Sequence, residues 1–158
     1  MWLILSDSHD NMIKIKHIPN IVEENNVTAI FHCGDFVSPF TLPYFLFENI
    51  EFYGVFGNND GEKILLHQKS NGKIKNGPVT IELENKKIFL MHEPYSLISA
   101  EKSGLYDYIF FGHTHEIVKR RFGKTLVLNP GELCGWLTSK ATYALLDPIT
   151  GEVEIKEL

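Results

Sequence analysis

The chain begins MWLILSDSHDN (residues 1–11), an apolar run followed at once by polar side chains of the kind that bind metals. Residues 1–5 predict a short buried strand. Side chains two positions apart on an extended chain point the same way, so Asp7 and His9 are expected to face one point. A carboxylate and an imidazole aimed together indicate a metal site, an acid–base pair or a polar turn, and the stretch alone leaves these three open.

The first half of the chain alternates apolar runs with segments of helical periodicity. An amphipathic helix is predicted over 12–25 with Asn11 as its N-cap, although Pro19 is expected to kink the helix or delay its start. Further strands are predicted over 27–31 and 52–56, and further helices over 39–49 and 61–69. This βαβαβ order is typical of a parallel sheet covered by helices.

The second half is richer in strands. A hairpin is predicted over 78–84 and 87–91, with its turn at Asn85-Lys86, followed by a helix over 95–103. Later strands are predicted over 108–111, 117–122, 125–128, 141–146 and 153–158. Strand after strand without long helices favours a second, largely antiparallel sheet. We therefore expect an α/β fold, a four-layer α/β/β/α sandwich of two packed mixed β-sheets flanked by helices, with residues 1–158 forming a single domain.

Composition narrows the classes of function. A chain of 158 residues that is 44% hydrophobic is long enough for one globular core. Its net charge of -5 argues against nucleic-acid binding, and the basic run Lys119-Arg120-Arg121 is interpreted as a solvated turn. Cys33 and Cys134 form no disulfide framework and are expected to be small buried hydrophobic residues. Without a secretory signal or an apolar run of roughly 20 residues, the expected location is the cytoplasm, away from membranes.

Potential metal ligands gather where the predicted strands end. Binding crevices of α/β sheets lie at the carboxyl ends of the strands. The side chains expected to converge there are Asp7, His9, Asp35, Asn58, His92, His113 and His115. Seven ligands are too many for one tetrahedral zinc ion and suit two ions of higher coordination that share a carboxylate, for which Asp35 is suitably placed. Nitrogen and oxygen donors without thiolate favour Mn²⁺, Fe, Co²⁺, Ni²⁺ or Zn²⁺, and the excess positive charge would suit a phosphate group.

The remaining histidines are assigned no chemical role. His17 and His67 fall on predicted helices and are interpreted as surface groups. His32 lies close to Asp35 in sequence and is expected either to support that residue or to pack in the core.

The order of the polar residues resembles the signature of the calcineurin-like metallophosphoesterases. Its five blocks stand here as Asp7-Ser8-His9, Gly34-Asp35, Gly57-Asn58-Asn59-Asp60, His92 and Gly112-His113-Thr114-His115. The short length, the Asn129-Pro130-Gly131 turn and the lack of an inserted cap resemble the small single-domain phosphodiesterase branch of archaea and bacteria. The resemblance runs from residue 5 to about residue 131 and implies a double β-sandwich flanked by helices.

This resemblance implies two divalent metal ions, with Mn²⁺ expected first and Ni²⁺, Co²⁺, Fe²⁺ or Zn²⁺ as alternatives. It implies one ion held by Asp7, His9, Asp35 and His115, and the other by Asp35, Asn58, His92 and His113. In the family mechanism a water or hydroxide activated by the two-metal centre attacks phosphorus in line, and no protein nucleophile is required. The resemblance thus implies a phosphodiesterase acting on a small phosphodiester, with Asp35 and Asn59 in catalytic roles.

Three positions depart from the family pattern. Asn59 replaces a common histidine and cannot usefully donate a proton, although it can hydrogen-bond a phosphate oxygen. We therefore predict faster turnover of activated aryl diesters than of esters with poor leaving groups. Glu93 replaces a usual glycine and is expected either to point away from the site or to repel an anionic substrate. Glu132 replaces a common serine and is interpreted as a salt-bridge partner or a surface group.

Two other functions stay open. A catalytically weak protein-interaction scaffold of the same fold, like the retromer subunit of this superfamily, would be supported by an exposed apolar patch. The aromatic residues that would supply this patch, unless they form core, are Phe40, Tyr44, Phe45 and Phe47. A phosphomonoesterase or nucleotidase would need extra positive groups, and no arginine is placed for that. The natural substrate and the oligomeric state, with a homo-oligomer as one alternative, are not predicted.

Overall fold

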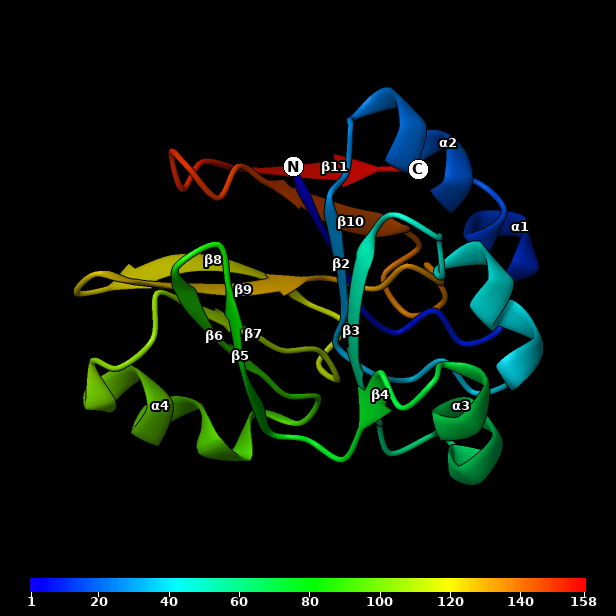
Figure 1. Cartoon of the computed structure of the whole chain (residues 1–158), viewed down its shortest axis with the longest axis horizontal. Helices are drawn as coiled ribbons and strands as arrows, with labels where there is room; N and C mark the ends of the chain where they lie inside the picture. Colours follow the sequence, from blue (N-terminus) through cyan, green and yellow to red (C-terminus); the bar gives the residue numbers. More distant parts are fainter.

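A computed structural model describes residues 1–158 and places the first apolar run in the interior of a six-stranded sheet (Figure 1). Its strands, in spatial order, are β11 (Val153–Glu157), β10 (Thr142–Leu146), β1 (Trp2–Leu5), β2 (Ala29–His32), β3 (Glu51–Val55) and β4 (Ile74–Lys75). The strands from β1 to β4 run parallel, and β10 is antiparallel to both of its neighbours. The strand β4 was not predicted, because two residues carry no recognisable periodicity.

The second sheet has five strands. In spatial order they are β5 (Val79–Leu83), β6 (Lys86–Leu90), β7 (Tyr108–Phe110), β9 (Thr125–Pro130) and β8 (Ile117–Phe122). The three inner strands are parallel, and only the two outer pairs are antiparallel. The expectation of a largely antiparallel second sheet was therefore wrong. Helix α4 (Leu97–Ser103) supplies the crossover that lets β6 and β7 run in the same direction.

The helices are shorter than the sequence predicted. Their bounds are α1 (Met12–Ile15), α2 (Ile18–Glu24) and α3 (Lys63–Lys69), with 3₁₀ segments η1 (Pro39–Tyr44) and η2 (Pro94–Ser96). The predicted helix over 12–25 divides in two, and Pro19 lies in the first turn of α2, where its missing N–H is tolerated. The predicted short helix over 39–49 is present only as the 3₁₀ segment η1, because Pro43 cannot donate the hydrogen bond that an α-helix would need there.

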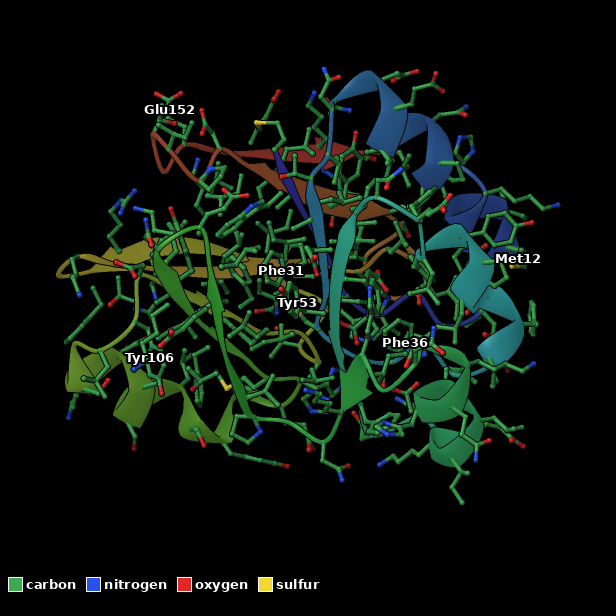
Figure 2. The ribbon with its side chains drawn as sticks, viewed as in Figure 1. Met12, Phe31, Phe36, Tyr53, Tyr106 and Glu152 are labelled. Carbon is green, nitrogen blue, oxygen red and sulfur yellow. The ribbon has the colours of Figure 1, made fainter.

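Alternating side chains of the inner strands build separate cores. On β1, Trp2 and Ile4 lie in the cluster between the two sheets, whereas Leu3 and Leu5 lie in the cluster beneath the helices. Figure 2 shows Phe31 between the sheets and Phe36 on the helical side. Helices α1, α2 and α3 cover one sheet and α4 covers the other (Figure 1). The expected α/β fold of two packed mixed sheets flanked by helices is confirmed.

The aromatic residues around η1 do not form the exposed patch that the scaffold alternative favoured. Phe45 is fully buried, and Tyr44 and Phe47 pack partly buried against the core. Phe40 alone is exposed, at 56%. No helix has the length and apolar character that a membrane crossing requires.

Candidate metal centre

The seven predicted ligands meet at the ends of strands from both sheets. They are delivered by the segments after β1 (Asp7, His9), β2 (Asp35), β3 (Asn58), β6 (His92) and β7 (His113, His115). Because the strands within each set are parallel, their carboxyl ends lie at one edge, and the packed sheets bring the two edges together.

Four of these residues form the first half of the site. Nε2 of His9 lies 3.4 Å from Oδ2 of Asp35 and 3.8 Å from Oδ1 of Asp7. Nε2 of His115 lies 3.4 Å from that same Oδ1 of Asp7. The donor atoms of Asp7, His9 and Asp35 all lie within 4.8 Å of one another, a spacing that one cation can span.

The second half of the site surrounds the amide oxygen of Asn58. Nε2 of His92 lies 2.9 Å from this oxygen, and Nδ1 of His113 lies 2.8 Å from it. Nε2 of His92 also lies 3.4 Å from Oδ2 of Asp35. Asp35 therefore contacts histidines of both halves through one carboxylate oxygen, the position expected of a bridging ligand.

The backbone of the site is unusual. Five of the seven predicted ligands have a positive φ, namely Asp7 (53°), His9 (41°), Asp35 (59°), His113 (69°) and His115 (58°). Asp7 and His9 thus converge as predicted, but through left-handed turns and not along an extended strand. Non-glycine residues rarely adopt this region, and such strain concentrates at functional sites.

Two buried polar atoms of the site have no hydrogen-bond partner, Oδ1 of Asp7 and Nε2 of His9. An unpaired buried polar group is costly, and a carboxylate oxygen facing imidazole nitrogens is a common arrangement around a divalent cation. The residues present therefore fit a metal ion, and its binding would satisfy both atoms.

The ionisation of Asp35 is controlled by its neighbours. Burial disfavours its charge, but the nearby His92 ring and the hydrogen bonds from Asn59 outweigh burial and hold the pKa of Asp35 well below its usual range. Burial lowers the pKa of His92, yet its contact with Asp35 raises the pKa overall. The nearby carboxylates of Asp7 and Asp35 raise the pKa of His9.

Asn59 makes a contact that the sequence did not predict. Its backbone N–H donates to Oδ1 of Asp35 and its side-chain Nδ2 donates to Oδ2, both at 2.8 Å. Asn59 thus holds the carboxylate of Asp35 on both oxygens. This geometry makes Asn59 a positioning residue for the expected bridging ligand.

Asp60 belongs to the quoted motif but was not among the predicted site residues. Its buried carboxylate accepts hydrogen bonds from the backbone N–H groups of Gly57 (2.7 Å), Val37 (2.7 Å) and Asp35 (3.2 Å). Asp60 therefore joins the loop that carries Asp35 to the loop that carries Asn58.

Of the two expectations for Glu132, the surface position was wrong and the pairing with a basic side chain is confirmed, because Glu132 is buried and contacts His115. Its side chain is fully buried and accepts a hydrogen bond from Nδ1 of His115 at 2.7 Å, leaving Nε2 directed at Asp7. The thiol of Cys134 also donates to it, at 3.0 Å. Burial together with this hydrogen bond raises the pKa of Cys134 to about 12, so the thiol remains a donor. A carboxylate that orients a metal-binding histidine is a recurring feature of metal sites.

Other sequence interpretations are settled by contacts. His32 is fully buried and stacks on Phe36 with ring centroids 3.7 Å apart. It also hydrogen-bonds Ser8 and accepts a hydrogen bond from the backbone N–H of Gly34, next to Asp35, so both expectations for His32, packing and support, have contacts behind them. Glu93 accepts a hydrogen bond from the exposed Tyr95 hydroxyl at 2.9 Å. Cys33 is a small buried side chain, as expected.

The basic run is part of strand β8 and not a turn. Lys119 and Arg121 donate to backbone carbonyl groups of Val153 and Gly151, and Arg120 pairs with Glu101. These cations are therefore engaged within the fold.

Fold and site agree with a known family. A family model described as calcineurin-like phosphoesterase superfamily domain matches residues 1–151, so the chain belongs to the calcineurin-like phosphoesterase superfamily. Phosphodiesterase MJ0936 of Methanocaldococcus jannaschii is 37% identical to this chain over 161 residues, which cover 98% of this chain and 96% of that protein.

Solved structures show the same architecture. A novel archaeal phosphodiesterase is similar with a TM-score of 0.90 and 36% identity, over 99% of each chain. Vps29 of Entamoeba histolytica, solved in complex with Zn²⁺, is similar with a TM-score of 0.58 and 16% identity, over 99% of this chain and 97% of that chain. At that identity the second likeness shows the fold alone.

Proposed function

We propose that this protein is a metal-dependent phosphodiesterase with a two-metal centre in a single domain. The observation that carries the proposal is the Asp35 carboxylate oxygen lying 3.4 Å from a histidine of each half of the site. The relative at 37% identity is named a phosphodiesterase, which supports the same substrate class.

We assign one ion to Asp7, His9, Asp35 and His115, and the other to Asp35, Asn58, His92 and His113. Mn²⁺ is the first choice, with Ni²⁺, Co²⁺, Fe²⁺ and Zn²⁺ as alternatives. When bound, the ions would supply a hydroxide nucleophile at neutral pH and offset charge on the phosphoryl oxygens.

The chain's own groups prepare this site. Asn59 fixes the charged carboxylate of Asp35. The backbone carbonyl of Cys33 lies 2.8 Å from Nδ1 of His92, which leaves Nε2 of that ring turned toward the site. We propose two roles for Asn59. It positions Asp35, and it is predicted to contact a phosphate oxygen of the substrate.

A small diester suits this site better than a dianionic monoester. The chain contains only two arginines, Arg120 and Arg121, and both lie on β8 with partners of their own. No guanidinium is therefore free to hold the extra phosphate charge of a monoester.

The test is to remove metals with a chelator and to add back Mn²⁺, Ni²⁺, Co²⁺ or Zn²⁺ singly while measuring hydrolysis of bis(p-nitrophenyl) phosphate. We expect metal-dependent turnover that Asp35→Ala or Asn58→Ala largely abolishes. If no metal raises the wild-type rate above that of these variants, the interaction scaffold becomes the better proposal. The fold likeness to Vps29 is consistent with that alternative, but the largely buried aromatic residues around η1 weaken it.

A further inference from the structure

The loop 132–138 is folded around the carboxylate of Glu132. Backbone N–H groups of Trp136 and Leu137 donate to this carboxylate at 3.1 and 2.9 Å, and the hydroxyl of Thr138 donates at 2.7 Å. The acceptor Glu132 is fully buried while the donors belong to exposed residues, so these bonds fasten an exposed loop to the interior and hold it in one conformation.

The same loop is joined to the segment that carries Asp7 and His9. The backbone N–H of Leu133 donates to the carbonyl of Ser6 at 2.9 Å, and that of Cys134 donates to the carbonyl of Asp7 at 3.0 Å. The side chain of Asn11 donates to the carbonyl of Cys134 at 2.7 Å. The loop is thus fixed relative to the proposed metal ligands.

Trp136 stands at the outer end of this fixed loop. Its side chain is 62% exposed, whereas Trp2 is fully buried. The ring centroid of Trp136 lies 6.1 Å from that of His9 at an interplanar angle of 32°, and the His9 ring stacks on His115 at 5.3 Å and 27°. The rings of His115, His9 and Trp136 therefore form a row that extends from the site to the protein surface.

The side chain of Trp136 is too exposed to add much to the core, yet its backbone N–H is held by the buried carboxylate of Glu132. We propose that Trp136 is the stacking surface for the planar aromatic group of the substrate, a nucleobase or an aryl ring esterified to the phosphate. This inference rests on the proposed function, because a phosphoryl group at His9 and His115 would place its ester substituent beside the indole. Stacking accepts any flat π-system, so the subsite selects for aromaticity and not for one base.

The test compares Trp136→Leu, Trp136→Phe and the control Phe122→Leu, which changes an exposed aromatic residue at the far end of β8. With bis(p-nitrophenyl) phosphate and Mn²⁺, we expect Trp136→Leu to raise KM roughly ten-fold, Trp136→Phe to restore most of it, and kcat to change little. Calorimetry with AMP and with ribose 5-phosphate gives a second readout. AMP should bind wild type more tightly than ribose 5-phosphate does, and Trp136→Leu should remove that difference.

An unchanged KM and an unchanged AMP preference in a folded Trp136→Leu variant would overturn the proposed stacking surface. A change of oligomeric state as the only effect of Trp136→Leu would overturn it as well. Metal-dependent turnover by wild type would leave the proposed function standing in that case. Absence of turnover in wild type would reject the proposed function separately, and the AMP comparison would still decide on the stacking surface.

Discussion

Asn59 holds both carboxylate oxygens of Asp35, one through its backbone N–H and one through its side-chain amide, each at 2.8 Å. The residue that replaces the family's common histidine thus supports the proposed bridging ligand. Asn59→Ala should weaken Mn²⁺ binding about 10- to 100-fold, because the carboxylate loses one of its two anchors. Calorimetric titration of the metal-free protein measures this, with the exposed Asn76→Ala as control. Equal affinity in Asn59→Ala and wild type would contradict the positioning role.

Residue 57 has to be a glycine because the side chain of Asp35 lies directly against it. A Cβ at Gly57 would overlap the Asp35 carboxylate, whereas a Cβ at Gly61, four residues on, would meet nothing within 4 Å. We expect Gly57→Ala to displace the carboxylate and to lower Mn²⁺ affinity at least ten-fold. A loss of this size is typical when a residue that supports a metal ligand is removed. Gly61→Ala should bind the metal as wild type does. Similar affinities for the two variants would show that the close approach is not needed.

Glu132 is expected to stabilise the whole loop that it organises. Glu132→Ala would remove the shared acceptor of the His115 ring N–H and of several backbone N–H groups, so the free energy of unfolding should fall by about 3–5 kcal/mol. Urea unfolding of the metal-free protein measures this loss. Glu152→Ala, at the exposed glutamate marked in Figure 2, should change stability by less than about 0.5 kcal/mol. A loss in Glu132→Ala no larger than in this control would reject the structural role of Glu132.

His32 should make the fold sensitive to acid. Burial lowers the pKa of His32 from 6.5 to about 3, so the unfolded chain takes up a proton below pH 6.5 that the folded protein does not bind. The contribution of His32 to the free energy of unfolding should therefore fall as pH drops from 6.5 toward 3, by roughly 2 kcal/mol at pH 5. The raised pKa values of His9 and His92 act in the opposite direction, so the effect of His32 is measured as the difference between wild type and a His32 variant.

Urea unfolding of the metal-free protein at pH 7 and pH 5 tests this dependence. His32→Gln should be less stable at pH 7 but should lose less on acidification, while the exposed His17→Gln should behave as wild type. Parallel losses in wild type and His32→Gln would show that His32 does not cause the acid sensitivity.

Much of the fold could be predicted because the strands are continuous apolar runs separated by glycine, proline and polar turns. The direction of strands in the second sheet could not be predicted, because β9 forms a hairpin with the edge strand β8 on one side and pairs in parallel with β7 on the other. That arrangement depends on packing between distant segments and leaves no local periodicity.

The residues that form the site were predicted better than their arrangement in space. The spacing of Asp7 and His9 suggested one shared face, and they do converge, but left-handed backbone at both residues produces that convergence. A pairing partner for Glu132 was predicted, but its burial was not, because a lone glutamate after a turn carries no signal of burial. Its partners, His115 and the backbone of residues 136–138, come together only in the folded chain.

The central claim is that Asp35 joins two metal ions in one site, and the most direct measurement is the number and coupling of bound Mn²⁺ ions. The metal-free protein would be titrated with Mn²⁺ by calorimetry and examined by electron paramagnetic resonance. The prediction is two ions per chain with a spin-coupled signal, and loss of that coupling in Asp35→Asn. A single ion per chain, or two ions whose signals stay uncoupled in the wild type, would contradict it.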